Sequence, residues 1–90
     1  MMRLYSIRDA KTQAFSTPFF QQNDETALRM FRDELHGSNG PPMLSKHPED
    51  FDLYCVGDWN DYSGAIRPTG DVDGPILVSK GADNEIKVNF

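Results

Sequence analysis

Cationic and aromatic side chains are interleaved in the first third of the chain. Single-stranded nucleic acids are held by cations along the phosphate backbone and by aromatic rings that stack on the bases. The residues that we predict to contact phosphates are Arg3, Arg8, Lys11, Arg29 and Arg32, and those that we predict to stack on bases are Tyr5 and Phe19. A structural interpretation competes with this one, because a 90-residue domain also needs aromatic side chains in its core.

The other residues that could do chemistry form no catalytic or metal-binding pattern. The cluster Asp58, Asn60 and Asp61 is followed by a serine where a calcium loop needs its glycine, so a hairpin turn is the better interpretation. His36 and His47 have no cysteine or second histidine at metal-ligand spacing. The single cysteine, Cys55, lies between apolar residues and is typical of a small buried hydrophobe. We expect no enzymatic activity, no catalytic residue, no metal and no cofactor.

The charge of the chain is divided unequally between its halves. The net charge is −5, which is unusual for a protein that binds nucleic acid. Residues 1–46 hold six Lys or Arg against five Asp or Glu, for a net +1, whereas residues 47–90 hold three against nine, for a net −6. If the protein binds an anion, the N-terminal half is expected to do it.

The length and composition indicate one small folded domain. Ninety residues with 38% hydrophobic content are enough for a single modest core. No apolar run approaches the roughly 20 residues of a membrane helix, and the N-terminus lacks the apolar stretch of a secretory signal. We therefore expect a cytoplasmic protein that does not associate with membranes.

The first half of the chain predicts two strands and a helix. Residues 2–8 alternate, with Leu4 and Ser6 on one face and Arg3, Tyr5 and Ile7 on the other. Residues 14–20 form a second extended segment, which Pro18 restricts to a sheet edge or breaks at Thr17. A helix is expected from about Asp24 to His36, with Asn23 or Asp24 as its cap and an apolar stripe at Ala27, Leu28, Phe31 and Leu35.

The second half predicts a hairpin followed by an acidic extension. Residues 37–44 are expected to be a loop and residues 46–50 a helical turn entered through proline. Residues 51–59 predict the clearest strand, with Phe51, Leu53 and Cys55 toward the core, and residues 65–68 return as its partner. We expect a single α+β domain over residues 1–69 and an acidic C-terminal extension over residues 70–90, in which residues 86–90 are a candidate edge strand.

Two segments resemble a viral protein family. The runs RLYSIRDAKTQAFSTPFF and KHPEDFDLY are similar to the small nonstructural, DNA-binding protein of gokushovirus-type single-stranded DNA microviruses. Members of that family share a strand followed by R-D, a P-F-F segment and K-H-P-E-D-F-D-L-Y. The resemblance covers residues 2–64, and residues 37–42 and the Asp-rich stretch after Arg67 lie outside the shared pattern. It implies a phage protein that contacts DNA in the cytoplasm of a bacterial host.

Together these observations predict an α+β fold, with a small antiparallel sheet of four to five strands and one amphipathic helix packed on one face. The expected function is non-catalytic binding of single-stranded DNA during replication or packaging of a small phage genome, by a homodimer formed through exposed sheet edges. The alternative is an acidic protein-interaction module that recruits or modulates a host or viral replication protein without binding nucleic acid. Both interpretations allow a replication or packaging protein as a partner.

Overall fold

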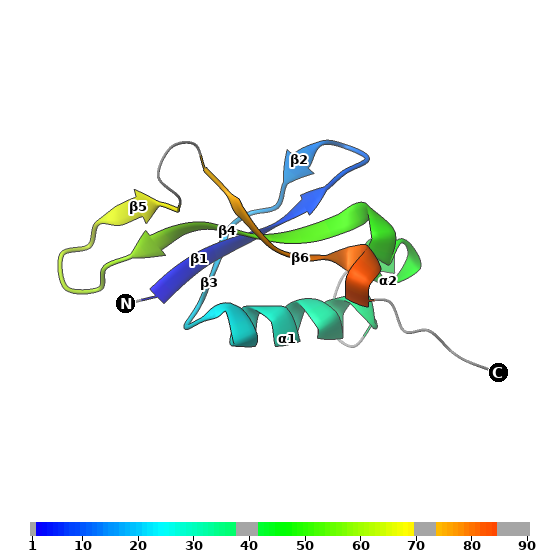
Figure 1. Cartoon of the computed structure of the whole chain (residues 1–90), viewed down its shortest axis with the longest axis horizontal. Coiled ribbons are helices and arrows are strands. Elements are labelled where there is room, and N and C mark those ends of the chain that lie inside the picture. The colour runs from blue at the N-terminus through cyan, green and yellow to red at the C-terminus, as the bar shows by residue number, and fades with distance from the viewer. Residues whose placement is uncertain (1, 38–41, 70–73, 85–90) are drawn as a thin grey trace.

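A computed structural model describes residues 2–37, 42–69 and 74–84, which form an antiparallel sheet with one main helix beneath it (Figure 1). The strands are β1 (Met2–Asp9), β2 (Ala14–Phe15), β3 (Phe19–Gln21), β4 (Phe51–Trp59), β5 (Ile66–Pro68) and β6 (Ile76–Lys80). The helices are α1 (Asp24–Leu35) and α2 (Pro42–Lys46), with the 3-10 turns η1 (Pro48–Asp50) and η2 (Gly81–Asn84). This arrangement confirms the predicted α+β class.

The two long strands β1 and β4 lie antiparallel at the centre of the sheet. On the edge of β1 that faces away from β4, β1 pairs with β2 and β3. On the edge of β4 that faces away from β1, β4 pairs with β5 and β6. The sheet therefore has six strands rather than the predicted four to five. The extended segment of residues 14–20 supplies two short strands instead of one, and residues 76–80 add another.

The predicted break near Thr17 is confirmed, and Ser16 explains how the sheet tolerates it. Pro18 has no N–H to donate, and residues 16–18 lie outside both β2 and β3. The backbone N–H of Ile7 donates to Ser16 Oγ at 3.0 Å, and the Ser6 hydroxyl donates to the Ser16 carbonyl at 2.8 Å. The side chain of Ser16 thus replaces a ladder hydrogen bond where the strand is interrupted.

Helix α1 begins where its capping residues are found. Asn23 Oδ1 accepts from the Thr26 N–H at 2.9 Å, and the Asn23 N–H reaches the Thr26 hydroxyl, which completes a capping box. Ala27, Phe31 and Leu35 are buried and pack toward the sheet. The predicted helix of residues 24–36 is therefore confirmed to within one residue.

The core lies between α1 and the sheet. It contains Tyr5 and Ile7 of β1 and Phe51, Leu53 and Cys55 of β4. Alternation predicted the three residues of β4, whereas Tyr5 was predicted to stack on bases and is instead buried. Cys55 is a free, buried thiol, which agrees with its predicted role. The turn after β4 is also as predicted, because Asn60 Oδ1 accepts from the backbone N–H groups of Tyr62 and Ser63.

The second half of the chain differs from the prediction at residues 42–46 and after residue 69. The predicted loop of residues 37–44 was wrong in part, because Pro42–Lys46 form the short helix α2, which begins at proline; residues 38–41 lie outside the described residues. The segment after residue 69 supplies β6, which pairs with β4. The domain boundary at residue 69 stays a prediction, and the candidate edge strand at residues 86–90 lies outside the described residues.

Candidate nucleic-acid interface

The face of the sheet opposite α1 carries four aromatic side chains. In Figure 1 α1 lies on one side of the sheet, and no helix of the described residues covers the other side. We call this uncovered side the open face. Strand register places Phe15 beside Arg8, Phe20 beside Leu4 and Tyr54 beside Ser6, all at positions that alternate with the buried residues Tyr5 and Ile7. The fourth ring, Trp59, pairs with Met2 at the far end of β1.

The four rings form two contacting pairs. Phe15 and Tyr54 meet edge to face, with their ring centroids 5.4 Å apart, and Phe20 and Trp59 lie tilted at the same separation. Phe15 is 45% exposed and Phe20 is 44% exposed, whereas Tyr54 and Trp59 are half-buried. Phe15 lies beside Arg8 and Phe20 lies beside Leu4, and these two residues of β1 are about 13 Å apart along the strand. The open face thus offers two aromatic surfaces to flat, apolar ligand groups.

A β-bulge in β4 puts Trp59 on the open face. Tyr5 pairs with Cys55 but Leu4 pairs with Gly57, so Val56 is an extra residue in β4. Strict alternation from Phe51, Leu53 and Cys55 would have pointed Trp59 toward α1. The bulge reverses the alternation, and Trp59 instead contacts Phe20.

The charges near the open face are few and mixed. The Arg8 guanidinium lies 5.9 Å from the centre of the Phe15 ring, and Asp52 is its partner across the ladder. Asp52 also accepts from the Gly81 N–H at 3.2 Å. Lys11 is exposed in the turn between β1 and β2, which rises on the side of the sheet away from α1 (Figure 1). Of the predicted phosphate contacts, Arg8 therefore lies at this face, and Lys11 is exposed in the turn that follows β1.

The predicted stacking residues Tyr5 and Phe19 lie on the other side of the sheet. Tyr5 is fully buried between β1 and α1, and its ring stacks on Phe19 with the centroids 6.2 Å apart. The Tyr5 hydroxyl donates to Asp24 Oδ1 at 2.5 Å. Burial, together with this hydrogen bond, raises the pKa of Tyr5. A ring in this position has no free face for a base, and Phe19 is half-buried against it.

The other predicted cations lie elsewhere. Arg3 is held between two carboxylates, with Nη1 2.7 Å from Asp24 Oδ1 and Nε 3.3 Å from Asp58 Oδ1. Arg29 and Arg32 are exposed on α1, at positions that alternate with the buried stripe of Ala27 and Phe31. The structure therefore does not bring the seven predicted residues to one surface.

Four rings of the open face were not among the predicted contacts, and the sequence indicated the direction of only one of them. Alternation with Leu53 and Cys55 already pointed Tyr54 outward. Phe15 and Phe20 flank the break at Pro18, and alternation across that break is not defined, so their direction followed only from the register of β2 and β3. The side of the sheet on which Trp59 lies depended on the β-bulge at Val56.

The described residues hold one compact group of metal-ligand side chains, formed by His47, Glu49 and Asp50 at η1. His47 Nδ1 lies 3.8 Å from Glu49 Oε1, and both side chains are about half exposed. Exposed pairs of this kind are common on protein surfaces without a metal. The absence of a metal site stays a prediction.

Comparison with known proteins identifies the family. The family described as phage ORF5 protein matches residues 2–84. The chain belongs to this family. Protein ORF5 of Chlamydia phage 1 is 33% identical over 69 residues, which cover 74% of this chain and 72% of the relative. The predicted resemblance to small microvirus proteins is confirmed, and the chain is a small ORF5-type protein of a microvirus-type phage.

No solved structure matches the chain at a significant level. Among the described residues, no helix is long and apolar enough to cross a membrane.

Proposed function

We propose that this phage protein binds single-stranded DNA on the open face of its sheet, without catalysis, during replication or packaging of the genome. The observation that carries the proposal is the pair of aromatic contacts Phe15–Tyr54 and Phe20–Trp59, in which two rings are more than 40% exposed. Aromatic rings on a sheet surface are stacking platforms for unpaired bases, and stacking contributes about 1–3 kcal/mol per base.

The same geometry favours a single strand over a duplex. The bases of a duplex are stacked on one another, and only their edges are accessible in the grooves. Rings such as Phe15 and Phe20 that lie against a sheet have no donor or acceptor with which to read those edges. An unpaired base, by contrast, can lay its face on them whatever its sequence.

Stacking also accounts for binding by a chain with a net charge of −5. Acidic side chains repel phosphates, so affinity that depended on charge alone would be weak. The open face needs only Arg8 and Lys11 to position the backbone while the rings bind the bases. Arg8 lies over Phe15, where a phosphate could follow a stacked base.

We further propose that the protein acts as a homodimer in the cytoplasm of the bacterial host. Ile66, Ile76 and Leu77 are 60%, 48% and 41% exposed on β5 and β6, which are edge strands among the described elements. Exposed apolar side chains beside an unpaired strand edge favour association. A two-fold dimer through this edge would align two open faces into one longer binding surface.

Fluorescence anisotropy with a labelled oligo-dT strand and a matched duplex tests the proposal. We expect the single strand to bind and the duplex not to bind. The double variant Phe15→Ala, Phe20→Ala is expected to weaken binding at least about tenfold, because two stacking surfaces are removed. Tyr62→Ala is the control, since Tyr62 is 98% exposed in the turn after β4 and contacts no ring of the open face.

Equal binding of the single strand by the wild type and the double variant would exclude the open face as the DNA-binding surface. No binding by folded protein would favour the second candidate function, an acidic module that binds a host or viral replication protein. The charge of −6 in residues 47–90 is the observation that supports that candidate.

A further inference from the structure

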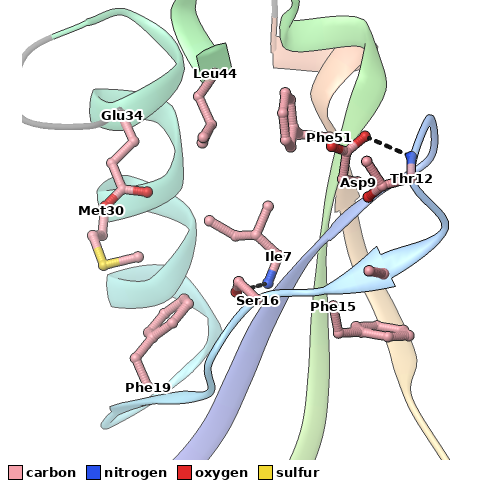
Figure 2. A pocket seen from close by; sticks show the side chains of 11 residues that line it. Ile7, Asp9, Thr12, Phe15, Ser16, Phe19, Met30, Glu34, Leu44 and Phe51 are labelled. Atoms are coloured by element: carbon pink, nitrogen blue, oxygen red, sulfur yellow. Dashed lines mark hydrogen bonds between the residues drawn. The ribbon is translucent and has the colours of Figure 1, made fainter. Parts of the chain in front are cut away.

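A second concave surface lies on the helix side of the sheet. It is a groove of about 500 Å³ between α1, Leu44 of α2 and the hairpin formed by β1 and β2 (Figure 2). Its floor consists of the buried side chains Ile7, Leu44 and Phe51. Phe19 and Met30 form the wall at α1 and β3. The groove is therefore apolar along its floor and along one wall.

The opposite rim of the groove is polar and belongs to an exposed segment. Thr12, Ala14 and Ser16 line it from the hairpin, and all three are exposed. Phe15 stands where this rim meets the open face, and Figure 2 shows its ring directed away from α1. Phe15 is the one proposed DNA-binding ring that lines the groove, so the groove adjoins the open face and otherwise consists of different residues.

Two carboxylates line the groove, and no cation does. Glu34 of α1 is half-buried, and burial raises the pKa of its carboxyl group. No described residue forms an ion pair with Glu34. Asp9 lines the groove near the hairpin turn, where its Oδ1 accepts from the Lys11 N–H at 2.9 Å and from the Thr12 N–H. A partly desolvated carboxylate without a counter-charge favours a cation from a ligand.

This charge pattern selects among possible occupants. DNA phosphates and anionic lipid headgroups are repelled by Glu34 and Asp9. A neutral apolar molecule would leave Glu34 desolvated further and without a partner, which costs free energy. A peptide that combines apolar side chains with one cation matches both the apolar floor and the Glu34 carboxylate. The volume lies within the roughly 300–1,000 Å³ of ordinary ligand sites, enough for a few side chains.

We propose that this groove binds a short apolar peptide segment of a partner protein, with a lysine or arginine of that segment paired to Glu34. The apolar side chains of the segment lie over Ile7, Leu44 and Phe51. The protein then has two surfaces that meet at Phe15, one for single-stranded DNA and one for a protein partner.

Selection from a displayed library of random heptapeptides tests this proposal on the full chain. We expect the enriched peptides to contain two or more apolar residues and one lysine or arginine. The most enriched peptide is then synthesised and titrated by calorimetry against the wild type and two variants. Glu34→Gln is expected to weaken binding about tenfold by removing the ion pair. Ala14→Trp is expected to abolish binding, because an indole at this exposed rim position fills the groove without removing a core side chain.

Asp33→Asn is the matched control, because Asp33 is the neighbouring acidic residue on α1 and does not line the groove. It is expected to leave the peptide affinity unchanged. Enrichment of no sequence, or of acidic peptides, would overturn the proposal. Equal binding of an enriched peptide to the wild type, Glu34→Gln and Ala14→Trp would place it outside this groove. Binding that Ala14→Trp abolishes and Glu34→Gln leaves intact would reassign the groove to a neutral apolar ligand.

Discussion

Tyr5 places an aromatic ring and a phenol at the centre of the protein, and the two parts have different roles. The ring is fully buried and packs on Phe19. The hydroxyl reaches the first turn of α1, where it donates to Asp24, and Asp24 also binds Arg3. Asp24 carries negative charge at the N-terminus of the helix, where the helix dipole favours it. Tyr5 thus ties β1 to the start of α1.

We predict that Tyr5→Phe lowers the free energy of unfolding by about 1–2 kcal/mol at pH 7, because the ring stays buried while the hydrogen bond to a carboxylate is lost. Urea denaturation measures this difference. Tyr62→Phe is the control and is expected to change nothing, since its side chain is 98% exposed. An unchanged stability of Tyr5→Phe would contradict the structural role of the hydroxyl.

The difference in unfolding free energy between the wild type and Tyr5→Phe is also expected to depend on pH. The pKa of Tyr5 is raised by burial and by the hydrogen bond to Asp24, so the folded state resists ionisation of the phenol. The stability that this group contributes is complete below the unfolded-state pKa of about 10 and is lost as the pH rises above it. The difference between the wild type and Tyr5→Phe should therefore narrow above about pH 10. A constant difference in urea denaturation across that range would count against this explanation.

At the scale of elements, the alternation of β1 and β4 and the apolar stripe of α1 allowed most of the fold to be predicted. These elements bury side chains at the regular spacing of strands and helices. The irregular parts were not predictable in the same way. Register decided the direction of Phe15 and Phe20, and the bulge at Val56 decided that of Trp59. Both depend on how strands pair, which a local pattern does not contain. Most of the candidate site was missed for that reason.

The junction of η1, β4 and η2 shows how tightly these elements meet. A Cβ atom on Gly81 would overlap the carbonyl oxygens of Pro48 and Phe51. We therefore predict that Gly81→Ala lowers the free energy of unfolding by more than about 2 kcal/mol, because backbone has to move to relieve the overlap. Ala82→Ser, at the next and exposed position, is expected to have little effect. Thermal unfolding of the two variants compares them directly, and equal stabilities would show that η2 does not pack as described.

At the scale of the whole molecule, the distribution of cations sets how binding responds to salt. Arg8 lies at the open face and Lys11 is exposed in the turn after β1, whereas Arg3 is paired with acids and Arg29 and Arg32 lie on the exposed side of α1. Release of counterions from single strands gives a slope of about −0.7 per phosphate contact in a plot of log affinity against log salt. Two contacts predict a shallow slope of about −1.4, where five would give about −3.5.

The double variant Arg29→Glu, Arg32→Glu tests whether the cations of α1 also contact phosphates. Both residues lie on α1, away from the open face. We therefore predict that the variant keeps the slope of log affinity against log salt and changes the affinity at physiological salt by no more than about twofold. The affinity is obtained by anisotropy at four salt concentrations. A steep slope, or a large loss of affinity in this variant, would move the DNA to the helix side of the protein.

The fluorescence of Trp59 during titration with oligo-dT is the most direct test of single-strand binding on the open face. Trp59 is the single tryptophan of the chain and contacts Phe20 on the open face, so it reports on this surface without a label. Because bases are proposed to stack beside Trp59, we expect oligo-dT to quench its fluorescence in a saturable manner. The double variant Phe15→Ala, Phe20→Ala is expected to weaken this quenching, and duplex DNA is expected not to produce it. Binding of the oligonucleotide, detected independently by anisotropy, with no change in Trp59 fluorescence would contradict single-strand binding on the open face.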